Sequence, residues 1–296
     1  MTRQILFAVA VLVAPCYGDE AREAVAVVTA VSGHASASGC GTVTAVSRFD
    51  WLSVGCIIDV GAGSSVTLAF ADGTRHALAE RTKAVVKSGG PRALVGTVHP
   101  LEAFPPMPRV ALHPQAEPGP RAGAVRIRDG EGDAAFARGI YPPEGGVALP
   151  ASTVVSFPAP GGAKTFAVEL EDESGHIVLM ARTEATRLAV PAGILKPACR
   201  YWLRVRTVDR IGSTLEGHSR FTTLSDREIE RRAAFKDSIE RRGDAESLAL
   251  LAEVDRQLGL LAEAREEFRM VLARFADDGV VRNALAELES RLPADR

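Results

Sequence analysis

Proline is distributed very unevenly along the 296 residues, and this distribution limits where regular structure can form. Six of the 17 prolines lie within residues 104–122, whereas residues 225–292 contain none. Proline fixes φ and lacks a backbone donor, so residues 104–122 are predicted to be a stiff linker. The proline-free segment is rich in Ala, Glu, Arg and Leu, which favour helix. We therefore predict a multidomain chain, with β structure on both sides of the linker and helices from residue 225 onward.

Residues 1–18 have the pattern of an export signal. Arg3 gives a positive start, and residues 5–14 form an unbroken apolar run that is shorter than the roughly 20 residues of a membrane span. Cleavage before Asp19 would leave a periplasmic or secreted protein with no later membrane span. A lipoprotein signal ending at Cys16 is the alternative, although a proline directly before that cysteine fits such a signal poorly.

Composition and motifs argue against several classes of function. The formal net charge is -2 and only 5% of residues are aromatic, so a nucleic-acid partner has no electrostatic or stacking support. Gly61 and Gly63 are followed by an alternating strand pattern, whereas a phosphate loop is followed by a helix. These glycines are therefore predicted to form a turn. The six histidines are scattered, without helical metal-site spacing.

These observations predict no catalytic, cofactor-binding or metal-binding residues, and hence a protein that is not an enzyme. A hydrolase whose catalytic residues are dispersed in the sequence remains an alternative, because spatial proximity is not visible in a sequence.

The expected export determines which redox state the cysteines can have. Cys40 and Cys56 lie in one short β-rich segment, where an oxidising compartment would allow a disulfide. Two small buried thiols are the other interpretation, and the sequence leaves both open. Cys199 would then have no partner.

The segments "VVTAVSGHASAS" and "FDWLSVGCIIDVGAGSSVTLAFADGTRHALAERTKAVV" resemble the FecR-type domain of bacterial envelope proteins. The resemblance rests on Gly33, the Leu52 and Gly55 step, and the hairpin at Asp72-Gly73. It implies an all-β periplasmic domain over residues 19–103. Some members of that family relay a signal to an anti-sigma system, but this chain has no cytoplasmic segment on which to base such a role.

Residues 123–224 show strand patterns about every ten residues, which favours a β-sandwich. The stretch "ILKPACRYWLRVRTVDRIG" with "SRFTTL" resembles a fibronectin type III domain. Leu195 and Tyr201 match the spacing of its tyrosine corner, in which the phenol is hydrogen-bonded to a backbone group. Phe157 stands where such domains usually have a tryptophan.

Residues 225–296 are predicted to form helical hairpins. A first helix runs from a cap at Ser225 to about Arg242, and a last one from Val280 to Leu292. The intervening "ESLALLAEVDRQLGLLAEAREEFRMVLARFADD" resembles one tetratricopeptide repeat. The repeat-packing positions are Gly259, Ala264 and Phe268. About three repeats are usual, so flanking helices or a partner must cover the remaining face.

The remaining predictions concern four single residues and one helix face. Trp51 and Trp202 are expected to be core anchors, with a ligand platform as the alternative for Trp51. The mixed charges of residues 228–242 predict an exposed helix face with intrahelical pairs, with a binding role for its arginines as the alternative. Asp277 and Asp278 are expected to be solvated.

Together these patterns predict a non-enzymatic, exported envelope protein that acts as an adaptor or scaffold. Its partner is expected to be an envelope protein that docks on residues 225–296. A cell-wall or carbohydrate-binding module, with the β domains as the contact surface, is the second hypothesis.

Overall fold

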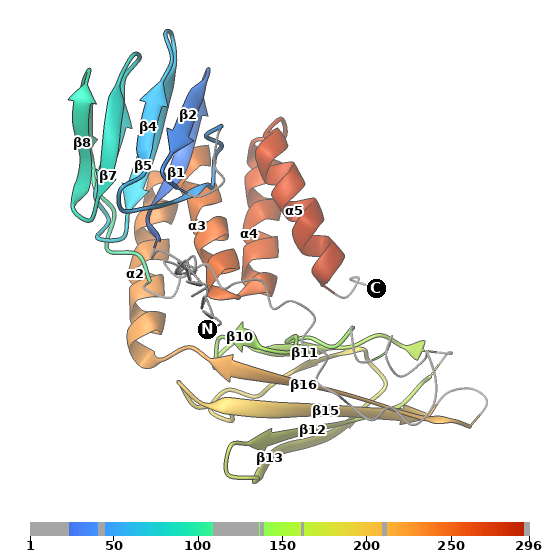
Figure 1. Cartoon of the computed structure of the whole chain (residues 1–296). Coiled ribbons are helices and arrows are strands. Elements are labelled where there is room, and N and C mark those ends of the chain that lie inside the picture. The colour runs from blue at the N-terminus through green and yellow to red at the C-terminus, as the bar shows by residue number, and fades with distance from the viewer. Residues whose placement is uncertain are drawn as a thin grey trace, which may run out of the picture.

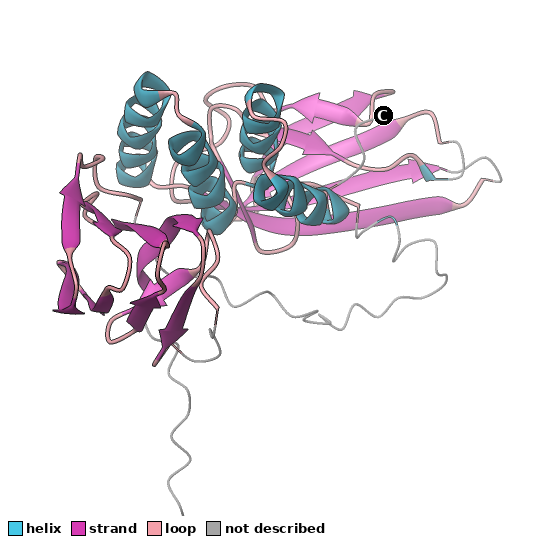
Figure 2. Ribbon diagram, turned by 90° about the horizontal axis from the view of Figure 1, so that it is seen from above, coloured by secondary structure: helices cyan, strands magenta, loops and turns pink. Residues whose placement is uncertain are grey.

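A computed structural model describes residues 24–40, 45–108, 136, 139–160, 163–208 and 212–292. The chain forms an N-terminal β region (residues 24–101), a central β region (139–224) and a helical region (225–292). The helical region lies between the two β regions in both views (Figure 1 and Figure 2). The expected signal at residues 1–18, with Cys16, and the linker beyond residue 108 lie outside the described residues.

The N-terminal β region consists of two antiparallel sheets, with strand orders β3-β1-β5-β6-β9 and β2-β4-β7-β8. Alternating side chains, such as Val66, Leu68 and Phe70 of β5, point into a core between the sheets. The strands are β1 (Ala24–Ser32), β2 (Ala35–Ser38), β3 (Trp51–Ser53), β4 (Ile57–Val60), β5 (Ser65–Phe70), β6 (Arg75–Leu78), β7 (Lys83–Lys87), β8 (Gly90–Val95) and β9 (Val98–Leu101).

The glycine turns of this region lie where they were predicted. Gly63 has a φ of +63°, and the strand β5, not a helix, follows it. Gly73 has a φ of +89° in the hairpin between β5 and β6. A side chain at Gly73 is excluded, because its Cβ would lie 2.0 Å from the carbonyl oxygen of Phe104.

The central β region is built from a five-stranded sheet of order β10-β16-β15-β12-β13 and a two-stranded sheet of β11 and β14. All neighbouring strands are antiparallel except β10 and β16. Phe157, Phe166 and Phe221 are buried in the core of this region. The strands are β10 (Gly146–Ala148), β11 (Val154–Ser156), β12 (Phe166–Asp172), β13 (Ile177–Thr183), β14 (Arg187–Ala189), β15 (Arg200–Val208) and β16 (Thr214–Thr223).

The helical region contains α2 (Asp226–Arg242), α3 (Ala245–Leu258), α4 (Leu261–Arg274) and α5 (Gly279–Arg291). The side chains of Ser225 and Asp244 accept hydrogen bonds from the first turns of α2 and α3, and Gly243 and Gly259 end these helices at positive φ. A mostly β chain with antiparallel sheets and a C-terminal helical segment is therefore confirmed.

The prediction that Asp278 is solvated was wrong. Its carboxylate accepts a hydrogen bond from the Val281 backbone N–H as the N-cap of α5, and lies 2.5 Å from Arg48 of the N-terminal β region. The free N–H groups at a helix start and a nearby cation both favour a carboxylate at this point.

The start of the expected linker is also not a free spacer. Phe104 and Met107 are buried, and their backbone N–H groups donate to the carbonyl oxygens of Gly73 and Ala71. The ring of Phe104 lies 5.8 Å from that of Phe235 of α2. The proline-rich segment shows no hydrophobic periodicity, so no regular structure was predicted for it. Its apolar side chains Phe104 and Met107 nevertheless pack against the helices.

Candidate functional site

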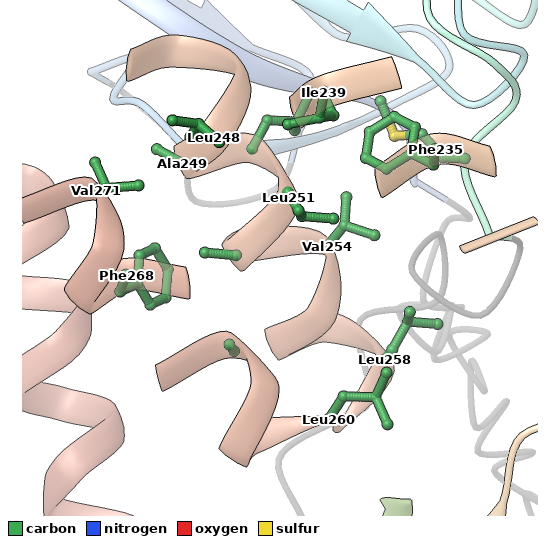
Figure 3. Packing of buried hydrophobic residues seen from close by; sticks show 14 of the residues in the cluster. Phe235, Ile239, Leu248, Ala249, Leu251, Val254, Leu258, Leu260, Phe268 and Val271 are labelled. Atoms are coloured by element: carbon green, nitrogen blue, oxygen red, sulfur yellow. The ribbon is translucent and has the colours of Figure 1, made fainter. Parts of the chain in front are cut away.

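Helix α3 is the most buried of the described helices. The apolar side chains of Leu248, Leu251, Ala252, Val254 and Leu258 are buried, and so are side chains on its other faces. Figure 3 shows apolar side chains of α2, α3 and α4 meeting in one cluster. The opposite side of α3 contacts β1 of the N-terminal β region. The incomplete helical stack expected from the sequence is thus covered by the chain's own β strands.

The repeat-like residues lie at the joints with both β regions. Ala264 and Phe268 are completely buried, and the ring of Phe268 lies 6.2 Å from that of Phe49 in the N-terminal β region. Gly259 ends α3 at a φ of +80°, and a Cβ there would lie 3.4 Å from the side chain of Val147 in β10. These residues therefore contact both β regions in addition to packing α3 against α4.

Polar contacts also connect the N-terminal β region to the helices. Arg75 lies 2.7 Å from Glu246, which also accepts a 2.5 Å hydrogen bond from Thr29. The indole N–H of Trp51 donates to Glu253 Oε1 at 3.0 Å. Trp51 is half-buried in this interface, so it serves as an anchor between regions and not as an open ligand platform.

A charge cluster is buried between α2, α3 and α4. Arg232 donates to both carboxylate oxygens of Asp255, and Lys236 Nζ lies 3.0 Å from Glu267 Oε1. Burial, with the nearby Asp255 carboxylate, raises the pKa of Glu267 to about 8. The mixed-charge face of α2 was predicted to be exposed with intrahelical pairs, and Arg231 forms such a pair with Glu228. Arg232 differs from the prediction: it is only 8% exposed and faces an acidic residue in the next helix.

Sequence reasoning missed this cluster, although one signal was available. Asp255 follows Leu251 by four residues and Ala252 by three, so it lies on the same helix face as these apolar residues. A carboxylate in such a place requires a cation from a neighbouring helix. The cations of residues 228–242 supply it, but their pairing across helices depends on tertiary structure.

Two cavities lie between the helices and the central β region, on either side of the loop at residues 149–152. One, of about 350 Å³, is lined by Tyr141, Lys236, Glu263 and Glu267 among others. The other, of about 400 Å³, is lined mainly by apolar side chains of the loop and α2. Neither lining includes a histidine or a cysteine. The pairing of histidine with carboxylate that would favour a hydrolase is therefore not present in these cavities.

The predicted site residues of the β regions lie as follows. Cys40 and Cys56 form a disulfide with a Cα separation of 4.9 Å, and Cys199 is a free cysteine. The hydroxyl of Tyr201 accepts a 2.7 Å hydrogen bond from the backbone N–H of Lys196, next to the buried Leu195. This is the contact that a tyrosine corner requires.

Trp202 is not the core anchor that the sequence suggested. It lies between the buried Tyr201 and Leu203 on β15, so its side chain points to the outer face of the sheet and is partly exposed. Strand alternation could have predicted this orientation, because Tyr201 was already assigned to the core.

The part of the chain that the structure describes holds no group of three or more His, Cys, Asp or Glu side chains placed to bind a metal ion. Among the described helices, none has the length and apolar character needed to cross a membrane.

Comparisons with known proteins found no relative that indicates the function of this chain. No family model and no curated protein matches the chain. Among solved structures, CopC from Methylosinus trichosporium OB3b is 19% identical with a TM-score of 0.24, over 29% of this chain and 90% of that chain. The FN1–FN3 domains of chicken CNTN1 are 7% identical with a TM-score of 0.23, over 69% of this chain and 58% of that chain. Likenesses of this extent carry no argument about family or function.

Proposed function

We propose that this chain is an exported, non-enzymatic scaffold of the bacterial envelope, which holds a protein partner on a rigid body. The observation that supports the proposal is the apolar cluster that continues from Val27 and Ala69 through the helices to Val147 and Leu224. Regions that share a core keep a fixed relative position, whereas regions joined only by linkers move independently. A rigid arrangement of the three regions can hold a bound partner in a fixed position.

The module resemblances belong to this proposal. The N-terminal β region is assigned to the FecR type on its glycine turns and hairpin. The central β region is assigned to the fibronectin type III type on its tyrosine corner at Tyr201. The helical region is assigned to a tetratricopeptide-like hairpin on Gly259, Ala264 and Phe268.

Export is supported by the Cys40–Cys56 disulfide, because such bonds persist in oxidising compartments. Alkylation of the mature chain in denaturant, directly after cell lysis, tests this, because the Cys56 side chain is fully buried in the folded chain. We expect one reactive thiol, Cys199, without reductant, and three after reduction. Three reactive thiols without reductant would contradict export.

We assign the docking surface to an edge strand and not to the helices, where it was expected from the sequence. The chain's own β region covers α3, whereas β8 is the last strand of its sheet and stands at the outer margin of the molecule (Figure 1). Leu94 and Val95 of β8 are 53% and 61% exposed. An edge strand can add an extended segment of another chain as a further strand, and Leu94 and Val95 supply apolar side chains for such a contact. We therefore assign partner docking to β8.

Crosslinking with mass spectrometry in native envelopes tests the scaffold, with point variants in the full-length chain. Removal of residues 225–296 is unsuitable, because it would expose Val27 and Phe104. We expect Val95→Lys to lose a specific envelope protein that the wild type captures. Met180→Lys, on the edge strand β13 of the other sheet, is the matched control. Loss in Val280→Lys instead would return docking to the helices, and capture unchanged in all three variants would refute a scaffold that docks at these surfaces.

A further inference from the structure

The outer face of the five-stranded sheet carries a row of basic and aromatic side chains on β15. Successive residues of a strand point to opposite faces, and Tyr201, Leu203 and Val205 point into the core. The outward positions are therefore Arg200, Trp202, Arg204, Arg206 and Val208, and we call the first four the arginine–tryptophan row. Neighbouring side chains of the row are about 7 Å apart along the strand.

One carboxylate orients two arginines of the row. Glu169 of β12 lies opposite Arg204, and its side chain is only 12% exposed. Its two oxygens lie 2.9 Å from Arg204 and 3.2 Å from Arg206, and Arg204 also lies 3.3 Å from Glu216. A guanidinium has five N–H donors, so both arginines keep donors for a further anion. Their side chains are 44% and 47% exposed.

The rest of the face is also basic. Arg220 of β16 lies opposite Trp202 and is held by Glu144 at 2.7 Å. Five arginines on this face lie among four glutamates, whereas the whole chain has a net charge of -2. These residues are Arg182, Arg200, Arg204, Arg206 and Arg220, with Glu144, Glu169, Glu171 and Glu216. The face therefore attracts anions more than the remainder of the molecule does.

We infer that the arginine–tryptophan row binds an acidic polysaccharide whose sugar units carry carboxylates. The C–H face of a sugar ring is apolar and packs on the partly exposed indole of Trp202. A carboxylate of the same or the next unit then lies within reach of Arg204 or Arg200, where a guanidinium forms bidentate hydrogen bonds. The two cavities beside residues 149–152 lie elsewhere, and a sheet face suits an extended chain that lies across it.

An acidic peptide fits the row less well. It would engage the arginines through its charges, but it has no regular apolar ring to place on Trp202. The position of the indole between two arginines on one strand is therefore the feature that distinguishes the polysaccharide from a peptide.

Binding to polygalacturonate by the mature chain tests the inference, with dextran as the neutral polysaccharide and poly-L-glutamate as the acidic peptide. We expect calorimetric titration to show binding to polygalacturonate, weaker binding to poly-L-glutamate and none to dextran. Trp202→Ala should weaken binding to polygalacturonate about tenfold. Trp202→Phe keeps an aromatic ring and should retain most of the affinity.

The charges are tested separately. The double substitution Arg204→Gln with Arg206→Gln should weaken binding and reduce its dependence on salt. Arg274→Gln, at an exposed arginine in the last turn of α4, is the matched control and should bind as the wild type does. Equal binding of poly-L-glutamate and polygalacturonate, or full binding by Trp202→Ala, would overturn the inference. The scaffold proposal does not depend on this result, since β8 lies in another sheet.

Discussion

Arg232 lies between two carboxyl groups that are themselves excluded from solvent. Its bidentate pairing with Asp255 neutralises a charge in the last turn of α3, and Glu267 lies 3.4 Å from the same guanidinium. Replacement by methionine keeps the apolar stem but leaves Asp255 without its partner. We expect Arg232→Met to lower the free energy of unfolding by about 3–5 kcal/mol in urea denaturation.

A neighbouring arginine provides the control for this change. Arg231 forms an intrahelical pair with Glu228 near the surface, so Arg231→Met should cost less than about 1 kcal/mol. Equal effects of the two substitutions would mean that the buried pair contributes no more than a surface pair.

Glu267 makes stability depend on pH. The pKa of its carboxyl is about 8 in the folded chain, against an ordinary value of 4.5. Below pH 4.5 the carboxyl is protonated in both states. Between pH 4.5 and 8 the unfolded chain releases this proton and the folded chain keeps it. The contribution of Glu267 to the free energy of unfolding therefore falls as pH rises, by up to about 1 kcal/mol per pH unit.

Glu267→Gln removes this titration while it keeps the shape of the side chain. We expect the variant to lose less stability than the wild type between pH 5 and pH 8, as measured by urea denaturation at each pH. Glu266→Gln, at an exposed position of the same helix, should follow the wild type. The same slope in Glu267→Gln would show that this carboxyl is ionised normally in the fold.

At the scale of elements, Asp278 performs two roles at the start of α5. It caps the helix, and it pairs with Arg48 of the N-terminal β region. Asn caps a helix about as well as Asp but carries no charge. We expect thermal or urea unfolding to show that Asp278→Ala is destabilised by about 1 kcal/mol more than Asp278→Asn. Equal losses in the two variants would mean that the cap adds nothing beyond the ion pair.

The elements themselves followed closely from local patterns. The alternating pattern after Gly63 predicted β5, and the cap at Ser225 predicted the start of α2. The prediction failed where a side chain finds its partner in another element. Arg232 and Asp278 both appeared solvated, since the sequence shows only their neighbours on the same helix.

At the scale of the whole molecule, the helices and the N-terminal β region share one core. Phe235 of α2 is completely buried and contacts Phe104, whose backbone is bonded to the hairpin of β5 and β6. We expect Phe235→Ala to cost about 3–5 kcal/mol. Hydrogen exchange should show that β1, β5, α2 and α3 lose protection together, because they open as one unit.

Phe157→Ala is the control at this scale. It creates a cavity in the separate core of the central β region, so protection should fall mainly there. If Phe235→Ala affected only the helices, the shared core would not act as a cooperative unit, and the rigid body proposed for the scaffold would lose its support.

The sequence by itself determined the kinds of element and their approximate limits. Proline content, strand alternation, caps and turn glycines act over a few residues, so they can be read from a linear chain. Only the tertiary structure decided what covers α3, which charges are paired and which way Trp202 faces the solvent. Those outcomes depend on contacts such as Arg48 with Asp278, which are 230 residues apart. Apolar burial is non-directional, so the covered face of a helix predicts that something packs on it but not which segment does so.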